Sequence, residues 1–531
     1  MNPADLQLPD TVDALKAMVL AMAEKAARVD VLEADIAVLT ATNATANERI
    51  ARLTSIIAMF QRAQHGKRSE RLRIEPLDDE QYAFVFDESE TGLAEIQAGL
   101  DKVRGASNAK RGSRPRKGFA PHLERIEVVI EPEDVPGREG QDKVLIGEDI
   151  SERLDVTPTR FRVIVTRRPK YAYRGEDGSV IQAPARSRII ASGIPTEALL
   201  AQIAVAKYAD GLPLYRQQAI YARDQVELDR SLMAQWMGKV GFELEPLADY
   251  LLARIKQGER VFADETTLPT LAPGSGKVKT AYLWAYARDD RPFGGSSPPM
   301  VAYRFEDSRS GDCVARHLDG YGGILQVDGY AAYNRLAKAD RTATPVTLAG
   351  CWAHVRRKFY ELHADASSPF ATRTVETMAS LWAIEEAVRG CSPQERVNMR
   401  QDQSVPIVAE LFTRWDRELP RLSGKSRLAE AIRYATSRRA VLDRFLADGR
   451  IEIDSNIVER AIRPQTITRK NALFAGSDGG GQTWATIATL ITTAKMNGVD
   501  PHAWMTQTLE RIANRWPNSQ IDELMPWNFS R

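Results

Sequence analysis

The sequence predicts an α/β core, in which a mixed sheet carries helices on its faces, preceded by smaller N-terminal units. From residue 260 onward, strand patterns alternate with helix patterns in the order βββαβαβα. Residues 360–450 are almost wholly helical in pattern, and the first 60 residues carry a heptad repeat. A chain of 531 residues is too long for one hydrophobic core, so we expect several domains.

The composition narrows the class of protein. It is 43% hydrophobic and 27% charged, which is ordinary for a soluble globular protein. The net charge of +1 does not point to any class of binding partner. A nucleic-acid-binding surface would therefore have to appear as a local cluster of cations. Three widely spaced cysteines fit a reducing cytosol. The N-terminus lacks a signal-peptide pattern, and no stretch approaches the ~20 apolar residues of a membrane helix, so we expect a cytoplasmic protein without a membrane partner.

A coiled coil is predicted for residues 1–65. Two seams start at Leu15 and Met18 and recur over seven heptads, and twelve of their fourteen positions are apolar. Asn43 stands at an a-type position, where a buried amide fixes register and oligomer number. The pattern predicts a homodimer or higher oligomer, and the alternative is a helix packed on its own chain.

Residues 66–124 are predicted to be a linker that turns from basic to acidic and back to basic. Its stretch KRGSRPRKG has no apolar side chain to bury. Such a segment is either a solvated tether or an arm that contacts DNA phosphates. Residues 125–192 are predicted to form a β-rich unit, because β-branched and aromatic residues occur there in short runs between turn residues.

Residues 193–245 are predicted to hold three helices, near 197–209, 213–223 and 229–240. The last would begin after Asp229 as its N-cap. The last two helices have helix-turn-helix spacing, in which the second helix lies in a major groove, although any three-helix bundle gives the same pattern. The basic residues expected to contact DNA here are Lys207, Arg216, Arg223 and Arg230.

The core is predicted to occupy residues 258–355 and 451–500, with a helical insertion at 356–450 between them. Residues 501–531 form a C-terminal element. Asp264 lies in the apolar run VFAD of the first strand, and Asp328 ends the fourth strand in ILQVDG.

These two aspartates are candidate metal ligands. An aspartate at the rim of a buried strand is disfavoured unless it is paired or liganded. The first and fourth strands can lie side by side in this topology, so the two carboxylates would repel each other, and a divalent cation relieves the repulsion. Carboxylate oxygens favour Mg²⁺ or Mn²⁺. Taken singly, each aspartate is better explained as a capped strand end; the metal interpretation depends on the pair.

Glu459 is the candidate for a third carboxylate, on a helix that follows the insertion. The alternative is structural: Asn456 and Glu459 fit a capping box, and Arg463 is placed for an i,i+4 ion pair. The glycines at 479–481 would be a loop, or would let the backbone approach a strand, before a helix that starts near Gln482.

Several motifs in one order resemble a known family. They are ADET at 263–266, VDGYAAYN at 327–334, GCWAHVRRKF at 350–359, IDSNIVERAIRP with RKNALFAGS at 453–477, and KYADGLPLYRQQ at 207–218. The chain resembles the DDE transposases of the insertion sequence 66 family over nearly its full length. The resemblance implies a ribonuclease-H-like catalytic core whose metal-binding triad is Asp264, Asp328 and Glu459.

The resemblance also implies the function and the partners. The chain would bind insertion-sequence ends and catalyse Mg²⁺-dependent DNA strand cleavage and strand transfer, with Mn²⁺ as a substitute ion. Terminal inverted repeats, target DNA and accessory proteins of the same element would be its partners, and the bound protein would associate with the bacterial nucleoid. Cations around the reacting bond would hold DNA phosphates and keep Glu459 ionised. Those cations are Arg356, Arg357, Lys358, Arg460, Arg463, Arg469 and Lys470.

One departure from the family concerns zinc. Relatives commonly carry a four-cysteine zinc segment before the helix-turn-helix. In this sequence the first cysteine is Cys313, and the only histidines before it are His65 and His122. Zinc is therefore not expected. Cys351 and His354 offer two further ligands, which are too few for a site.

Two alternative functions remain open. The chain could be a catalytically idle DNA-binding regulator of the element, or a metal-dependent nuclease that cleaves without joining. Inverted repeats bounded by a direct duplication in the flanking DNA would favour transposition.

Overall fold

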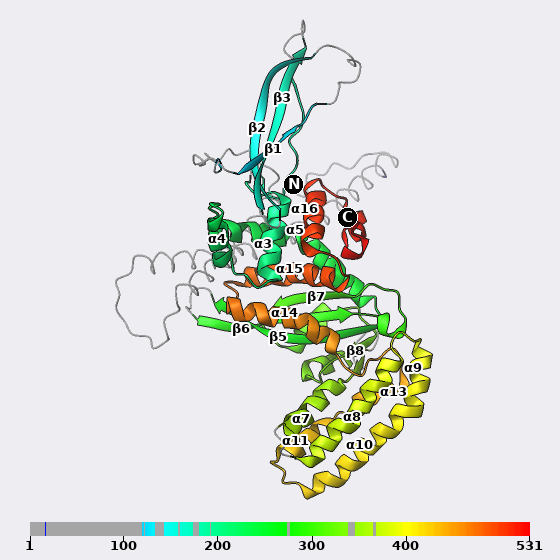
Figure 1. Cartoon of the computed structure of the whole chain (residues 1–531). Helices are drawn as coiled ribbons and strands as arrows, with labels where there is room; N and C mark the ends of the chain where they lie inside the picture. The colour runs from blue at the N-terminus through cyan, green and yellow to red at the C-terminus, as the bar shows by residue number, and fades with distance from the viewer. Residues whose placement is uncertain are drawn as a thin grey trace, which may run out of the picture. The chain divides into compact units, whose positions relative to one another are not determined.

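A computed structural model gives the fold (Figure 1). It describes residues 16, 119, 121, 123–132, 143–157, 160–173, 180–191, 193–272, 277–337, 346–364 and 368–530. The coiled coil predicted for 1–65 and the linker predicted for 66–124 lie outside these residues, apart from single positions. The chain forms two compact units, and the elements below belong to the unit of residues 75–271 and 278–531, apart from the tips of two strands.

A small sheet lies where the β-rich unit is expected. Its strands are β1 (Glu124–Val129), β2 (Lys143–Thr157), β3 (Arg160–Tyr173) and β4 (Val180–Gln182). Their order is β1-β3-β2, with β4 on β3; β1 runs parallel to β3, and the other pairs are antiparallel. Alternate residues of β3 are buried, namely Phe161, Val163 and Val165, so one face of this sheet packs on the rest of the unit.

Three helices follow the small sheet. They are α3 (Glu197–Tyr208), α4 (Leu214–Arg223) and α5 (Arg230–Lys256). Asp229 caps α5 as predicted, since its side chain accepts from the backbone N–H of Ser231. The end predicted near residue 240 is wrong, because α5 continues to Lys256. Gly241 lies within α5 at a close contact, since a Cβ there would stand 2.8 Å from Thr483.

The central sheet has five strands, which confirms the predicted mixed α/β class. They are β5 (Arg260–Ala272), β6 (Lys277–Arg288), β7 (Met300–Glu306), β8 (Ile324–Gln326) and β9 (Thr347–Ala349), in the order β7-β6-β5-β8-β9. β7 is antiparallel to β6, whereas β8 is parallel to both β5 and β9. Short elements connect them: η2 (Arg291–Phe293), α6 (Gly311–His317) and the 3₁₀ helix η3 (Ala331–Ala337).

Helices α14 (Asn456–Ala472), α15 (Asp478–Met496) and α16 (Pro501–Ala513) follow the insertion, before η6 (Asn518–Leu524) and η7 (Pro526–Asn528). α15 covers the edge strand β7: the backbone N–H groups of Val301 and Tyr303 donate to the hydroxyls of Thr493 and Thr489. The expectation of a loop at residues 479–481 is wrong, because these glycines lie inside α15. The predicted close approach to a strand is present, since a Cβ at Gly481 would stand 2.4 Å from the Phe305 ring.

The insertion is helical and has its own core (Figure 1). Its elements are α7 (Trp352–Ala364), α8 (Pro369–Ala387), α9 (Pro393–Met399), the π turn η4 (Arg400–Ser404), α10 (Val405–Glu418), η5 (Leu419–Arg421), α11 (Arg427–Thr436), α12 (Arg439–Leu442) and α13 (Arg444–Ala447). Aromatic rings fill its centre, with Phe359 stacked on Trp415 at 5.2 Å between centroids. None of the helices in the described ranges is long and apolar enough to cross a membrane.

Candidate active site

One aspartate lies on strand β5, and a second lies just beyond the end of the neighbouring strand β8. β5 and β8 pair in parallel, and Phe262 lies opposite Gln326 at the last paired position. Asp264 and Asp328 each follow these residues by two positions along the chain. The predicted adjacency of the first and fourth strands is therefore confirmed, and it brings the two carboxylates together.

Asp264 lies in the electrostatic field of other acids. Its Oδ1 accepts a hydrogen bond of 2.8 Å from the backbone N–H of Glu265. Burial, reinforced by neighbouring negative charges, raises the pKa of the Asp264 carboxyl to about 7. The acids that contribute are Glu265, Asp328 and Glu459. Charges from β5, β8 and α14 thus act on one carboxyl group.

Glu459 occupies the first turn of α14 and faces α7. Its Oε1 lies 3.6 Å from Nδ1 of His354, and its Oε2 lies 3.5 Å from the guanidinium of Arg357. The hydroxyl of Ser455 donates to Oε1 at 3.3 Å. The carboxylate is therefore held between two chain segments that are about a hundred residues apart in sequence.

The capping alternative for Glu459 does not describe this helix. The N-cap of α14 is Ser455 rather than Asn456, and it makes no side-chain capping hydrogen bond. Asn456 donates its side-chain N–H to Asp454 at 2.8 Å instead. Among the described residues, the ion pairs of Glu459 join it to α7, so the i,i+4 pair with Arg463 is also absent.

A second acid on β5 was missed by the sequence analysis. Glu265 accepts hydrogen bonds from the guanidinium of Arg309 at 2.5 Å and from the hydroxyl of Tyr333 at 2.8 Å. Burial raises the pKa of the Glu265 carboxyl, although its bond to Arg309 opposes the rise. The only signal in the sequence is the position of Glu265 directly after Asp264, because Arg309 and Tyr333 come from separate segments.

The insertion reaches the second aspartate. The hydroxyl of Tyr434 on α11 donates to the backbone carbonyl of Asp328 at 2.9 Å. The guanidinium of Arg438 lies 4.0 Å from the centroid of the Tyr434 ring. Gly329 has a φ of +100°, and a Cβ there would stand 2.7 Å from Nε of Arg438, so this turn requires glycine.

The cations predicted near Glu459 divide into exposed and anchored side chains. Arg460, Arg463 and Lys470 are exposed on α14. Arg469 is anchored, because it donates to the hydroxyls of Thr266 and Thr267 on β5 at 3.2 and 2.8 Å. On α7 the exposed cations are Arg357, paired with Glu459, and Lys358, which lies 4.0 Å from Glu430. Arg356 is half-buried, with its guanidinium 5.3 Å from the Tyr360 ring.

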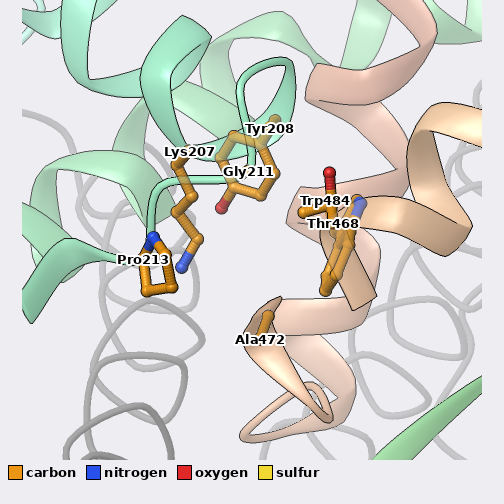
Figure 2. Close-up of a pocket in the computed structure, with 7 residues that line it drawn as sticks. All are labelled: Lys207, Tyr208, Gly211, Pro213, Thr468, Ala472 and Trp484. Atoms are coloured by element: carbon orange, nitrogen blue, oxygen red, sulfur yellow. The ribbon is translucent and has the colours of Figure 1, made fainter. Parts of the chain in front are cut away.

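The cations predicted on the three-helix segment are placed differently. Lys207 is 3% exposed and lines a small pocket with Tyr208 and Trp484 (Figure 2), so its side chain is not on an open surface. Arg216 and Arg223 are exposed on α4, and Arg230 is half-buried at the start of α5.

The predicted recognition helix α5 is a core helix. Met233, Trp236, Met237 and further residues along it are buried. Its exposed positions include the acids Glu245 and Asp249. Of the predicted cations, the exposed ones are therefore on α4, and Arg230 is half-buried at the start of α5.

Comparison with known proteins settles the family. Residues 192–483, more than half of the chain, match the model of the transposase IS66 family. The chain belongs to the IS66 transposase family. Residues 489–527 match the IS66 C-terminal element, and residues 52–128 match a model described as transposase C of IS166 homeodomain. The site carboxylates of this IS66-family transposase all fall inside the first match.

Relatives of similar length occur in Sinorhizobium fredii. The uncharacterized protein y4qI is 66% identical over 529 residues, which cover 98% of each chain. The uncharacterized protein y4jD is 41% identical over 90% of this chain and 94% of its own. A third, y4hP, is 36% identical over 90% of this chain and 88% of its own.

The zinc-finger match of this transposase lacks the cysteines that relatives carry. Residues 139–175 match the zinc-finger binding domain of transposase IS66, yet they contain neither cysteine nor histidine. The segment contains strands β2 and β3, and ion pairs between side chains connect the two strands. Asp149 lies 2.7 Å from Lys170, and Glu148 lies 2.8 Å from Arg167. Hydrogen bonding to Lys170 lowers the pKa of the Asp149 carboxyl.

Proposed function

We propose that this chain is a DDE-type transposase whose ribonuclease-H-like core cleaves insertion-sequence ends and joins them to target DNA. Asp264, Asp328 and Glu459 are its metal-binding carboxylates. The observation that supports this most strongly is the convergence of the three acids. Asp264 on β5 and Asp328 after β8 each lie two residues beyond the last paired position of these strands, and Glu459, far along the chain, acts electrostatically on Asp264.

The carboxylates fit a hard divalent cation. Their oxygens are the ligand type that Mg²⁺ and Mn²⁺ prefer. Burial, with smaller contributions from neighbouring acids, raises the pKa of the Asp264 carboxyl to about 7, and a bound divalent cation would favour its ionised form. Bound divalent ions would supply activation of the attacking oxygen and stabilisation of the leaving oxygen in phosphodiester chemistry.

The surrounding residues position these acids. Arg309 and Tyr333 hold the Glu265 carboxylate, which fixes the β5 backbone next to Asp264. Tyr434 holds the backbone carbonyl of Asp328 from the insertion. Positioning and charge neutralisation are the main protein contributions to phosphoryl transfer, because the protein forms no covalent bond to the phosphate.

Exposed cations beside Glu459 are proposed to bind DNA phosphates around the reacting bond. Arg460, Arg463 and Lys470 on α14 and Arg357 and Lys358 on α7 are charged and exposed. Arg469 and Arg356 contribute from half-buried positions, and Arg469 also ties α14 to β5. Arg216, Arg223 and Arg230 would extend the contact to the element's ends. Buried Lys207 is not part of this surface.

Each domain predicted from the sequence has a role in this proposed function. Residues 1–65 would bring two chains together as a coiled coil, because transposition has to bring the two ends of the element into one complex. Residues 258–355 and 451–500 would form the catalytic core, with the insertion at 356–450 supporting it. The C-terminal element at 501–531 completes the chain.

A joining assay tests the proposal. Purified protein is mixed with Mg²⁺, a labelled, already cleaved end taken from the DNA that flanks the gene, and a supercoiled target. We expect the labelled end to become covalently linked to the target, and we expect Asp264→Asn to abolish this. Cleavage of uncut ends without joining would show a nuclease. Sequence-specific end binding with neither reaction would show a regulator.

A further inference from the structure

A cysteine and a histidine adjoin the carboxylate of Glu459. Sγ of Cys351, a ring nitrogen of His354 and a carboxylate oxygen of Glu459 lie within 4.8 Å of one another. Cys351 follows β9, His354 is in the first turn of α7, and Glu459 is in the first turn of α14. The sequence offered only two of these ligands, and the fold supplies the third.

Each side chain presents a donor atom to this point. Cys351 is buried, and its Sγ accepts a hydrogen bond of 3.3 Å from the backbone N–H of Ser455. Burial raises the pKa of the Cys351 thiol to about 11, so the thiol would lose its proton on binding a cation. Nδ1 of His354 is buried and, within the described ranges, has no hydrogen-bond partner. It lies 3.6 Å from Oε1 of Glu459, while Arg357 contacts the other oxygen, Oε2.

We propose that Cys351, His354 and Glu459 form a site for one divalent transition ion of the Zn²⁺ type. A sulfur, a nitrogen and an oxygen ligand suit Zn²⁺ or Co²⁺, whereas Mg²⁺ favours oxygen alone. Three protein ligands leave one tetrahedral position open for water or another ligand. The unpartnered Nδ1 gains its missing partner when such an ion binds.

The site has a consequence for catalysis, which rests on the proposed function. Glu459 belongs to both ligand sets, so an ion held by Cys351 and His354 competes for the carboxylate that the Mg²⁺ reaction needs. We expect Zn²⁺ to inhibit Mg²⁺-dependent cleavage, and we expect Cys351→Ser to weaken that inhibition at least about tenfold.

Co²⁺ titration of the metal-free full chain tests the site without any DNA. Thiolate-bound Co²⁺ gives a near-ultraviolet charge-transfer band, and the chain has three cysteines that could produce it. We expect one Co²⁺ per chain with this band. Cys351→Ser should remove the band, and His354→Gln should weaken Co²⁺ binding at least about tenfold.

Cys313→Ser is the matched control. Cys313 is also buried, but it lies in α6, with its Sγ near the backbone carbonyl of Ser308. The band should persist in this variant and in Cys391→Ser. Absence of the band from the wild-type chain, or its persistence in Cys351→Ser, would overturn the site. Neither result depends on DNA cleavage, so the site and the proposed transposase function fail separately. If Cys351→Ser does not fold, unchanged Co²⁺ affinity in folded His354→Gln overturns the proposal.

Discussion

At the scale of single residues, the candidate site contains Asp264, a carboxyl whose pKa is raised mainly by burial. Asp264 and Asp328 were predictable, because an aspartate inside an apolar strand pattern is visible in the sequence. Arg309, Tyr333 and Tyr434 were not, because hydrogen bonds to Glu265 and to the Asp328 backbone arise only from tertiary packing. Sequence spacing carries no trace of such contacts.

The raised pKa of Asp264 predicts a pH-dependent stability. A carboxyl whose folded pKa is about 7 stabilises the fold when protonated, and this contribution is lost as pH rises through about 7. In metal-free protein, Asp264→Asn should therefore raise the unfolding free energy at pH 8 by on the order of 2 kcal/mol, after allowance for solvent screening. The gain should shrink toward pH 5.

Denaturant unfolding of both proteins in chelator measures this difference. Asp312→Asn, an exposed acid paired with Arg335, is the control and should show no such trend. An Asp264→Asn gain that grows toward pH 5 would contradict the assigned sign.

At the scale of elements, the sequence of strands and helices along the core and one strand adjacency were predictable, whereas helix ends were not. The βββ hairpin pattern and the adjacency of β5 and β8 follow from alternation of apolar residues and from connection rules. The length of α5 does not, because α5 packs on α15 and β7, and such tertiary packing is not visible in local propensity. The predicted β-rich unit at 125–192 contains β2, whose acids pair across to cations of β3.

The surface of α4 predicts where end binding is lost. The double variant Arg216→Ala, Arg223→Ala removes two exposed cations without disturbing the core. Binding to the element's ends should weaken, and the slope of log affinity against log salt should decrease by about 2 if both contact phosphates. Gel shifts at several salt concentrations measure this. Glu245→Gln, at an exposed position of α5, is the control. An unchanged slope in the double variant would show that the DNA-binding surface is not on α4.

A buried ion network joins the insertion to the sheet. Arg400 is fully buried and bonds the Glu385 carboxylate at 2.6 Å and the backbone carbonyl of Phe445 at 2.7 Å. Arg396 pairs with Glu385 at 2.9 Å and with Glu452 at 2.7 Å, and Glu452 also lies 3.3 Å from Arg260 on β5.

Arg400→Met should leave the buried Glu385 carboxylate with Arg396 as its remaining ion-pair partner. The backbone carbonyls of Phe445, Asp448 and Ile451 would lose the donor that Arg400 supplies. We expect a loss of about 3–5 kcal/mol in unfolding free energy. Arg389→Met, which removes an exposed pair with Glu386, should cost less than about 1 kcal/mol. Equal costs in the two variants, measured by denaturant unfolding, would show that the buried network adds little.

At the scale of the whole molecule, the predicted association of two chains rests on the heptad pattern of the sequence. Residues 10–62 should associate through the heptad seam, and Asn43→Leu should strengthen association while loosening oligomer specificity. Analytical ultracentrifugation of the full chain and of this variant measures both effects. A full chain that sediments as a monomer at tens of micromolar, roughly where seven heptads should associate, would contradict the coiled-coil prediction.

The central claim is that Glu459 completes a metal-binding triad with Asp264 and Asp328. Glu459→Gln keeps size and hydrogen bonding but removes the charge that a divalent ion needs. Combining it with Asp264→Asn should add little, because residues that act as one unit are non-additive.

The direct measurement is Mg²⁺-dependent nicking of a labelled end, beside a binding assay on the same protein. We predict that Glu459→Gln loses nicking by orders of magnitude, as Asp264→Asn does, while both still bind the end. Glu410→Gln, an exposed acid on α10, should nick as the wild type does. Near wild-type nicking by Glu459→Gln, together with an inactive Asp264→Asn, would contradict the account and assign the third ligand to another acid.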